Sequence, residues 1–247
     1  AMSGEWIPRS PISTPTGVIA ATTNHVGYHP LIKMYYEDGY LTEVEGGGTY
    51  GELARTHLCC YPNINTAQYP YYEGKPGFFY IHEIALGTNP KWFRPPDADM
   101  SVTTVNERLK AGYLHIGVGA SLEHEPRAAR RSEAWQAFAE EQNVPFYHGL
   151  HLHLYFPTYT VDIRNSNRSV DIIRNGRMTS LDDAEVRALA SRYGDPDEIL
   201  AEDWIAEVAG INAPGSFEDY AQNPYPYHKA VNDKILDGTY EHFYPPN

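Results

Sequence analysis

Three histidines stand within six positions in the stretch FYHGLHLHLYF, residues 146 to 156. Side chains at positions i and i+2 of a β-strand share a face, so a strand here would place His151 and His153 together. The leucines that alternate with them would face apolar packing on the other side. Two imidazoles on one strand face form half of a metal site. His148 precedes a glycine at which the strand can bend, so its direction stays open.

Two further residues of ligand type interrupt runs that are otherwise apolar and strand-like. Glu83 lies in FFYIHEIALG and His115 lies in YLHIGVGAS. Burying a carboxylate without a partner is costly or forces it to stay protonated, and a bound cation removes that cost. Together with the histidine pair, these residues predict a metal site. The alternative is that the histidines are hydrogen-bonded core residues and that Glu83 pairs with an arginine.

Other kinds of catalytic site fit the sequence less well. Ser121 in GVGASLE does not complete the GxSxG elbow of a serine hydrolase. The glycine run in EGGGTYGE lacks the spacing of a phosphate-binding loop. Cys59 and Cys60 are adjacent and carry no signature of a thiol enzyme. A vicinal pair rarely forms a structural disulfide, so we expect a reducing, cytoplasmic compartment.

The elements that must position these residues are a mixture of strands and helices. Residues 5 to 60 are rich in β-formers, with a hairpin turn expected at Asp38-Gly39 and a helix expected with Thr49 as its N-cap. Further helices are expected in SVTTVNERLKAG, RRSEAWQAFAEEQN, LDDAEVRALASRYG and DEILAEDWIAEVAG, and a strand pair in TYTVDIRNSNRSVDIIRNGRMTS. We therefore predict an α+β fold, with a mixed or antiparallel sheet and flanking helices.

The chain divides by composition into a catalytic domain and a tail. We assign residues 1–210 to a metal-binding domain and residues 211–247 to a C-terminal tail rich in proline and tyrosine. Proline supplies no backbone donor and restricts its neighbours, so segments such as NPYPYH are expected to be extended. We expect the tail to pack on a subunit or on its own domain. Its aromatic side chains favour a homo-oligomer.

The net charge of the chain limits the classes of partner that it can bind. The formal net charge is −13, which argues against nucleic acid and anionic lipid as main partners. The sequence contains no signal segment at its start and no apolar run of about 20 residues. We therefore expect neither export nor a membrane span.

Several of these stretches occur in the order of a known family. GEWIPRSPISTPTGVIA, IHEIALGTNP, LHIGVG and the His-x-His strand resemble the metal-binding domain of aminopeptidase T-type metallo-aminopeptidases, across residues 4–177. The same domain is shared by 2,5-dihydroxypyridine 5,6-dioxygenase. In the peptidases the resemblance implies two metals, with ligands falling on Glu5, Glu83, His115, and His151 with His153. In the dioxygenase it implies one ferrous ion held by two histidines and a carboxylate.

The chain departs from the peptidase pattern. The aspartate of the family's H-x-D pair is His153 in one register, while in the other register the pair becomes His153 with Tyr155. A tyrosine expected after the third motif is also absent, with Leu122 near its position. Two-metal hydrolysis relies on bridging carboxylates, so a neutral imidazole in place of an aspartate favours a single ion.

The leading hypothesis is a mononuclear non-haem Fe(II) dioxygenase that acts on a hydroxylated aromatic or N-heteroaromatic ring with O₂. His115, His151 and His153 would hold the iron, with Glu83 as a ligand or base. His124 or His148 would act as an acid or base on the substrate hydroxyl. The alternative is an aminopeptidase or amidase that uses Zn, Mn or Co, with Glu83 or Glu5 activating water. A third hypothesis is a non-catalytic relative whose histidines only pack.

Overall fold

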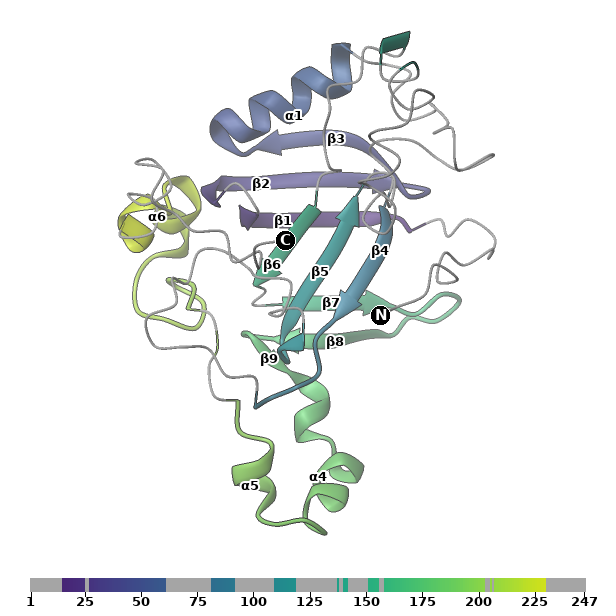
Figure 1. The fold of residues 1–247 in the computed structure, drawn as a ribbon, viewed down its shortest axis with the longest axis vertical. Helices are drawn as coiled ribbons and strands as arrows, with labels where there is room; N and C mark the ends of the chain where they lie inside the picture. Colours follow the sequence, from purple (N-terminus) through teal and green to yellow (C-terminus); the bar gives the residue numbers. More distant parts are fainter. Residues whose placement is uncertain are drawn as a thin grey trace. The chain divides into compact units, whose positions relative to one another are not determined.

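The computed structural model describes residues 15–24, 27–60, 81–91, 109–118, 137, 140–141, 151–155, 158–202, 205 and 207–229 (Figure 1). The chain divides into two compact units. The first contains Ala1–Ala20, Leu31–Ile84 and Ile116–Leu152, and the second contains Ala21–Pro30, Ala85–His115 and His153–Asn247.

Three sheets of three strands each hold the strands that the structure describes, in the orders β1-β2-β3, β4-β5-β6 and β7-β8-β9. The strands are β1 (Gly17–Asn24), β2 (Gly27–Glu37), β3 (Tyr40–Gly46), β4 (Ile81–Leu86), β5 (Tyr113–Val118), β6 (His151–Tyr155), β7 (Thr158–Asp162), β8 (Ser169–Arg174) and β9 (Arg177–Met178). The helices are α1 (Gly48–Cys60), α4 (Ala184–Ala190), α5 (Pro196–Ile199) and α6 (Phe217–Gln222), with 3-10 turns η2 (Thr179–Asp182) and η3 (Tyr225–His228). The predicted α+β fold is confirmed. None of the described helices is long and apolar enough to cross a membrane.

In the first unit the hairpin of β2 and β3 turns at Asp38 and Gly39, as the sequence predicts. Their φ angles are 50° and 87°, and two successive positive φ angles define the type I′ turn that matches the twist of paired strands. The two strands are antiparallel, and alternate residues of β2 together with Leu41 of β3 are buried. Helix α1 packs against β3, and Arg55 of the helix donates from Nη1 to the Gly46 carbonyl at 2.8 Å.

Helix α1 begins two residues earlier than the sequence suggests. The backbone N–H of Gly51 donates to the carbonyl of Gly47 at 3.0 Å, so Gly47 is the residue whose carbonyl accepts the first intrahelical bond. Thr49 lies inside the first turn, and the prediction that it caps the helix is wrong. The glycine run before it supplies the cap through its backbone instead.

In the second unit the β7–β8 hairpin leads through β9 and η2 into α4 and α5. Ala111, Met178, Leu181, Ala190 and Leu200 form a buried apolar cluster there. Both helices have aspartate caps, since Asp183 accepts from backbone N–H groups of α4 and Asp195 from one of α5. The apolar cluster joins the two short helices to β9 at the end of the third sheet.

The long helix predicted for DEILAEDWIAEVAG is wrong beyond its first turn. α5 ends at Ile199, and the described residues from Leu200 to Val208 are not helical. Residues two apart in an α-helix point about 200° apart, toward nearly opposite sides. Leu200 is buried in the apolar cluster and the Glu202 side chain is buried in an ion pair, so the chain leaves the helix where both can be covered.

Within the second unit, the beginning of the tail packs on residues of β1 and β2. The ring of His228 stacks on Tyr28, with centroids 3.6 Å apart and planes 9° apart. The Tyr220 hydroxyl lies 3.2 Å from Nε2 of His228 and 3.1 Å from the hydroxyl of Thr22. Contrary to our expectation of an extended NPYPYH segment, its residues 225–228 form the 3-10 turn η3.

Acid should release this part of the tail. Burial lowers the pKa of His228 from its ordinary 6.5 to about 4. The unfolded state then binds more protons than the folded state between these values, so stability is present above about pH 6.5 and falls as the pH drops toward 4. After correction for intrinsic rates, we expect hydrogen exchange in α6 and η3 to be faster at about pH 5 than at about pH 7.5.

Hydrogen exchange must be followed in α6 and η3 themselves, because burial also lowers the pKa of His29. The stability of the whole fold will therefore fall in acid as well. Strand β8 provides an internal reference for global opening. His228→Gln keeps a neutral, polar side chain of similar size that does not titrate. The faster exchange of α6 and η3 in acid should therefore disappear in this variant. Equal exchange at both pH values in the parent protein would contradict this prediction.

Candidate metal centre

The sheet β4-β5-β6 carries four of the residues that the sequence singles out as metal ligands. Glu83 belongs to β4, His115 to β5, and His151 and His153 to β6. In the strand order β5 is the middle strand, hydrogen-bonded to both neighbours (Figure 1). His115 and His153 both fall in the second unit, on adjacent strands. Three runs that are far apart in the sequence are therefore neighbours in one sheet.

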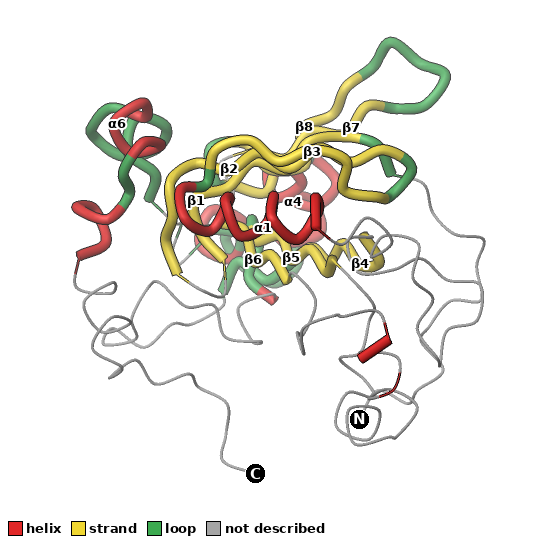
Figure 2. The backbone as a smooth tube through the Cα atoms, turned by 90° about the horizontal axis from the view of Figure 1, so that it is seen from above, coloured by secondary structure: helices red, strands yellow, loops and turns green. Residues whose placement is uncertain are grey.

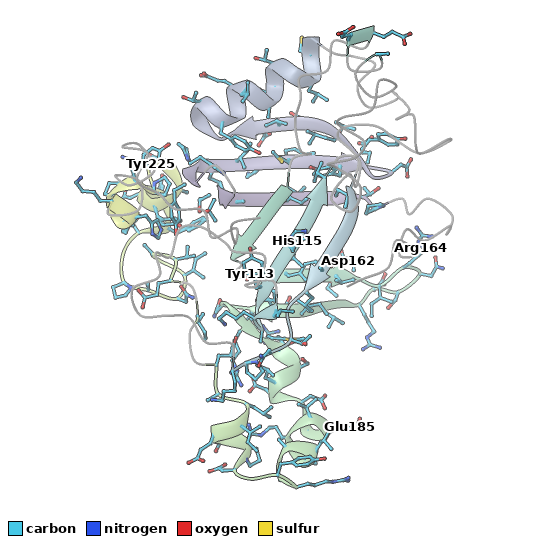
Figure 3. The ribbon with its side chains drawn as sticks, viewed as in Figure 1. Tyr113, His115, Asp162, Arg164, Glu185 and Tyr225 are labelled. Atoms are coloured by element: carbon cyan, nitrogen blue, oxygen red, sulfur yellow. The ribbon has the colours of Figure 1, made fainter. Side chains whose placement is uncertain are left out.

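Strand β5 is buried along its whole length. All of its residues from Tyr113 to Val118 are buried, and His115 is 2% exposed. By alternation Tyr113 and His115 share one face of the strand, while Leu114 and Ile116 share the other. Both polar side chains can be followed on β5 in Figure 3. A fully covered middle strand is the rigid position from which a ligand can be held accurately.

The remaining predicted site residues are less completely described. The structure describes the backbone of Glu83, His151 and His153 within their strands, and their side chains lie outside the described part. Glu5, His124 and His148 lie outside the described residues altogether. Among the side chains that are described, no three His, Cys, Asp or Glu groups come together in a way that would hold a metal ion. The metal site therefore stays a prediction.

A buried ion pair lies just before β5 and was not predicted from the sequence. Nζ of Lys110 is 3.3 Å from Oε1 of Glu202, and the two side chains are only 4% and 1% exposed. The same ammonium donates to the carbonyl of Ala111 at 2.9 Å. Two unlike charges removed from water stabilise the fold only if they remain paired. The pair therefore fixes Lys110 and Glu202 against each other.

Arg177 of β9 extends this ion pair to the surface. Its Nη1 is 3.3 Å from Oε2 of Glu202, and its Nη2 is 2.8 Å from Oδ1 of Asp182. Burial raises the pKa of Glu202, while the charges of Lys110 and Arg177 act in the opposite direction. The hydrogen bond to Arg177 holds the pKa of Asp182 below its usual value. The inner carboxylate is thus shared between two cations.

Gly112 lets the backbone approach closely enough for these contacts. Its φ is +77°, and a Cβ atom there would lie 2.3 Å from the carbonyl oxygen of Gly176 and 3.4 Å from Oε1 of Glu202. Any other residue would push the two segments apart. The chain is therefore held at residues 110–112, three residues before His115.

Sequence reasoning missed Lys110 and Glu202 because both lie in stretches that were expected to be helices. Charged residues in an amphipathic helix normally face solvent. One local signal was available, since the lysine stands directly before Ala-Gly and a continuous apolar strand. Its partner is 92 positions away and has no signal of its own.

Removing one member of the buried pair should be strongly destabilising. Lys110→Met leaves Glu202 buried with Arg177 as its remaining cation, and we expect a loss of about 3 kcal/mol in the free energy of unfolding. Lys110→Met with Glu202→Leu should recover most of this loss, because no buried charge is left and Arg177 keeps Asp182. Urea unfolding with a common m-value would measure both changes.

The exposed pair of Lys33 and Glu45 is the matched control. Its atoms are 3.9 Å apart and its side chains are 46% and 51% exposed. Lys33→Met should therefore change the free energy of unfolding by less than about 1 kcal/mol. Equal effects of the two single lysine substitutions would show that the buried pair has no special role.

Comparison of the chain with models of known protein families, with curated proteins and with solved structures found no match.

Proposed function

We propose that this chain is a mononuclear non-haem Fe(II) enzyme, related to the aminopeptidase T and 2,5-dihydroxypyridine 5,6-dioxygenase superfamily. Its reaction would be the cleavage of a hydroxylated aromatic or N-heteroaromatic ring with O₂. One observation supports this above the rest. The strands that carry Glu83, His115 and the His-x-His pair are consecutive neighbours in one sheet.

The chemistry of the donor set fits a single borderline ion. Imidazoles with one carboxylate suit Fe(II), whereas a dinuclear centre needs bridging carboxylates to offset the repulsion of its cations. His115, His151 and His153 would hold the ion, with Glu83 as a further ligand or as a base. A bound ferrous ion would supply the redox chemistry that lets O₂ react with an electron-rich ring. Zn, Mn or Co are the alternative occupants.

The chain's own residues would do the rest of the work. The buried position of His115 favours a water-poor site, in which charges and dipoles act strongly on a bound substrate. Aromatic residues near these strands would supply apolar walls for a flat ring, and the fully buried Tyr113, on the same strand face as His115, would pack behind them. His124 or His148 would take the proton from the substrate hydroxyl, and Glu83 would serve as a base if it is not a ligand.

We also propose a compartment, a catalytic domain and an assembly for this enzyme. We infer a cytoplasmic enzyme, because the chain has only the vicinal cysteines and these favour a reducing compartment. We also infer that residues 1–210 form the catalytic domain and that the enzyme works as a homo-oligomer.

Metal content should decide between the possible activities. We expect about one iron per chain in protein purified anaerobically without chelator, measured by inductively coupled plasma mass spectrometry. The double variant His151→Ala/His153→Ala and the single variant His115→Ala should each lose the iron, because each removes imidazole ligands. The parent should then consume O₂ with a hydroxylated N-heteroaromatic compound in an oxygen electrode.

His228→Gln is the control for loss of a histidine, since His228 packs on Tyr28 and lies outside the β4-β5-β6 sheet. It should retain its iron. About two zinc or manganese ions per chain, with release of amino acids from peptides, would replace the dioxygenase by a hydrolase. Absence of any metal from the parent would mean that the histidines are core residues, and the enzyme proposal would be wrong.

A further inference from the structure

The β7–β8 hairpin forms an exposed arm, here defined as residues 158–174 (Figure 2). Its strands pair antiparallel, and the backbone N–H of Ile163 donates to the Arg168 carbonyl at 2.9 Å to close the loop. The Thr160 hydroxyl donates to Asp171 across the strands at 2.7 Å. All residues from 160 to 170 are exposed. The arm therefore has a defined shape with little of its tip covered.

The tip of the arm combines apolar side chains with positive charge. Val161, Ile163 and Val170 are 37%, 40% and 37% exposed, and Val161 pairs with Val170 across the strands. Arg164 and Arg168 are the charged residues of the connecting loop, and neither forms an ion pair with the described part of the chain. Exposed β-branched residues on a ribbon indicate a contact surface.

A second surface of the same unit has the opposite charge. This patch, called the α4–α5 patch, presents Leu189 and Tyr193, which are 53% and 80% exposed. Glu185 of α4 and Glu198 of α5 are exposed beside them in the sequence and form no ion pair within the described residues. Across residues 182–198 there are six acidic and two basic side chains. Figure 3 shows Arg164 on the arm and Glu185 on α4.

We propose that the chain forms a two-fold dimer in which the arm of each copy lies on the α4–α5 patch of the other. The two surfaces match in kind, since each joins exposed apolar side chains with an excess of one charge, and this excess is positive on the arm and negative on the patch. A two-fold axis uses such a pair twice, so that both arms and both patches are covered. The net charge of −13 repels copies in most orientations, and the basic arm favours this one. The dimer does not depend on the metal centre.

A charge-swap experiment tests this arrangement. In the acidic-arm variant, Arg164→Glu/Arg168→Glu, an acidic tip would meet an acidic patch. In the basic-patch variant, Glu185→Lys/Glu198→Lys, a basic tip would meet a basic patch. By sedimentation velocity we expect the parent to dimerise and each variant alone to dimerise at least about tenfold more weakly.

Mixing the two variants in equal amounts gives the decisive result. Each contact of the mixed dimer joins opposite charges, because the acidic arm meets the basic patch and the native arm meets the native patch. We therefore expect native mass spectrometry to find mixed dimers of near-parental strength. Lys33→Glu, which changes an exposed lysine of the first unit, is the control and should leave the parental dimer unchanged.

Circular dichroism of each variant distinguishes misfolding from loss of the contact between the arm and the α4–α5 patch. A parent that remains monomeric, variants that dimerise as well as the parent, or a mixture that does not regain dimers would each overturn the proposal. Dimers regained only in the mixture would support the pairing of arm with patch, and a defined dimer without larger assemblies would support its two-fold closure.

Discussion

The buried contact between Lys110 and Glu202 is the constraint on which the second unit depends. It joins residues 92 positions apart, and both charges are out of water, so that neither segment can leave without exposing the other to a large desolvation penalty. Arg177 connects the same carboxylate to β9, and the close approach at Gly112 holds the backbone beside it. The start of β5 is thereby tied to the third sheet and to the end of α5.

This anchoring helps to hold His115 in a fixed position. The histidine follows three residues after Gly112 on a strand that is buried throughout and hydrogen-bonded on both sides. A side chain on such a strand cannot move without disturbing its neighbours, which is the property a metal ligand needs. The same sheet brings the strands of Glu83, His151 and His153 alongside, and this adjacency supports the proposed iron enzyme.

Charge is distributed unevenly over the chain, and the distribution matters more than the total. Segments such as 182–198 carry an excess of acidic residues, whereas both charged residues in the loop of the β7–β8 arm are arginines. Surface charges contribute little to folding stability but strongly influence which surfaces meet. In the proposed dimer, the locally basic arm would therefore favour the orientation in which it meets the acidic patch of the other copy. The tail is held differently, by the stacked and hydrogen-bonded rings of Tyr28, Tyr220 and His228.

The sequence by itself determined the features that depend on neighbouring residues. The turn at Asp38-Gly39, the strand around His115 and the β7–β8 hairpin are all present as expected, because turn chemistry and side-chain alternation act within a few positions. It also identified the ligand-type residues of the candidate centre. Only the tertiary structure decided which strands are neighbours in the sheet β4-β5-β6.

Tertiary structure also decided that Lys110 pairs with Glu202, that α5 stops at Ile199, and that His228 lies on Tyr28. Each of these depends on a partner far away in the chain, and the residues beside a buried group do not reveal which distant residue that partner is.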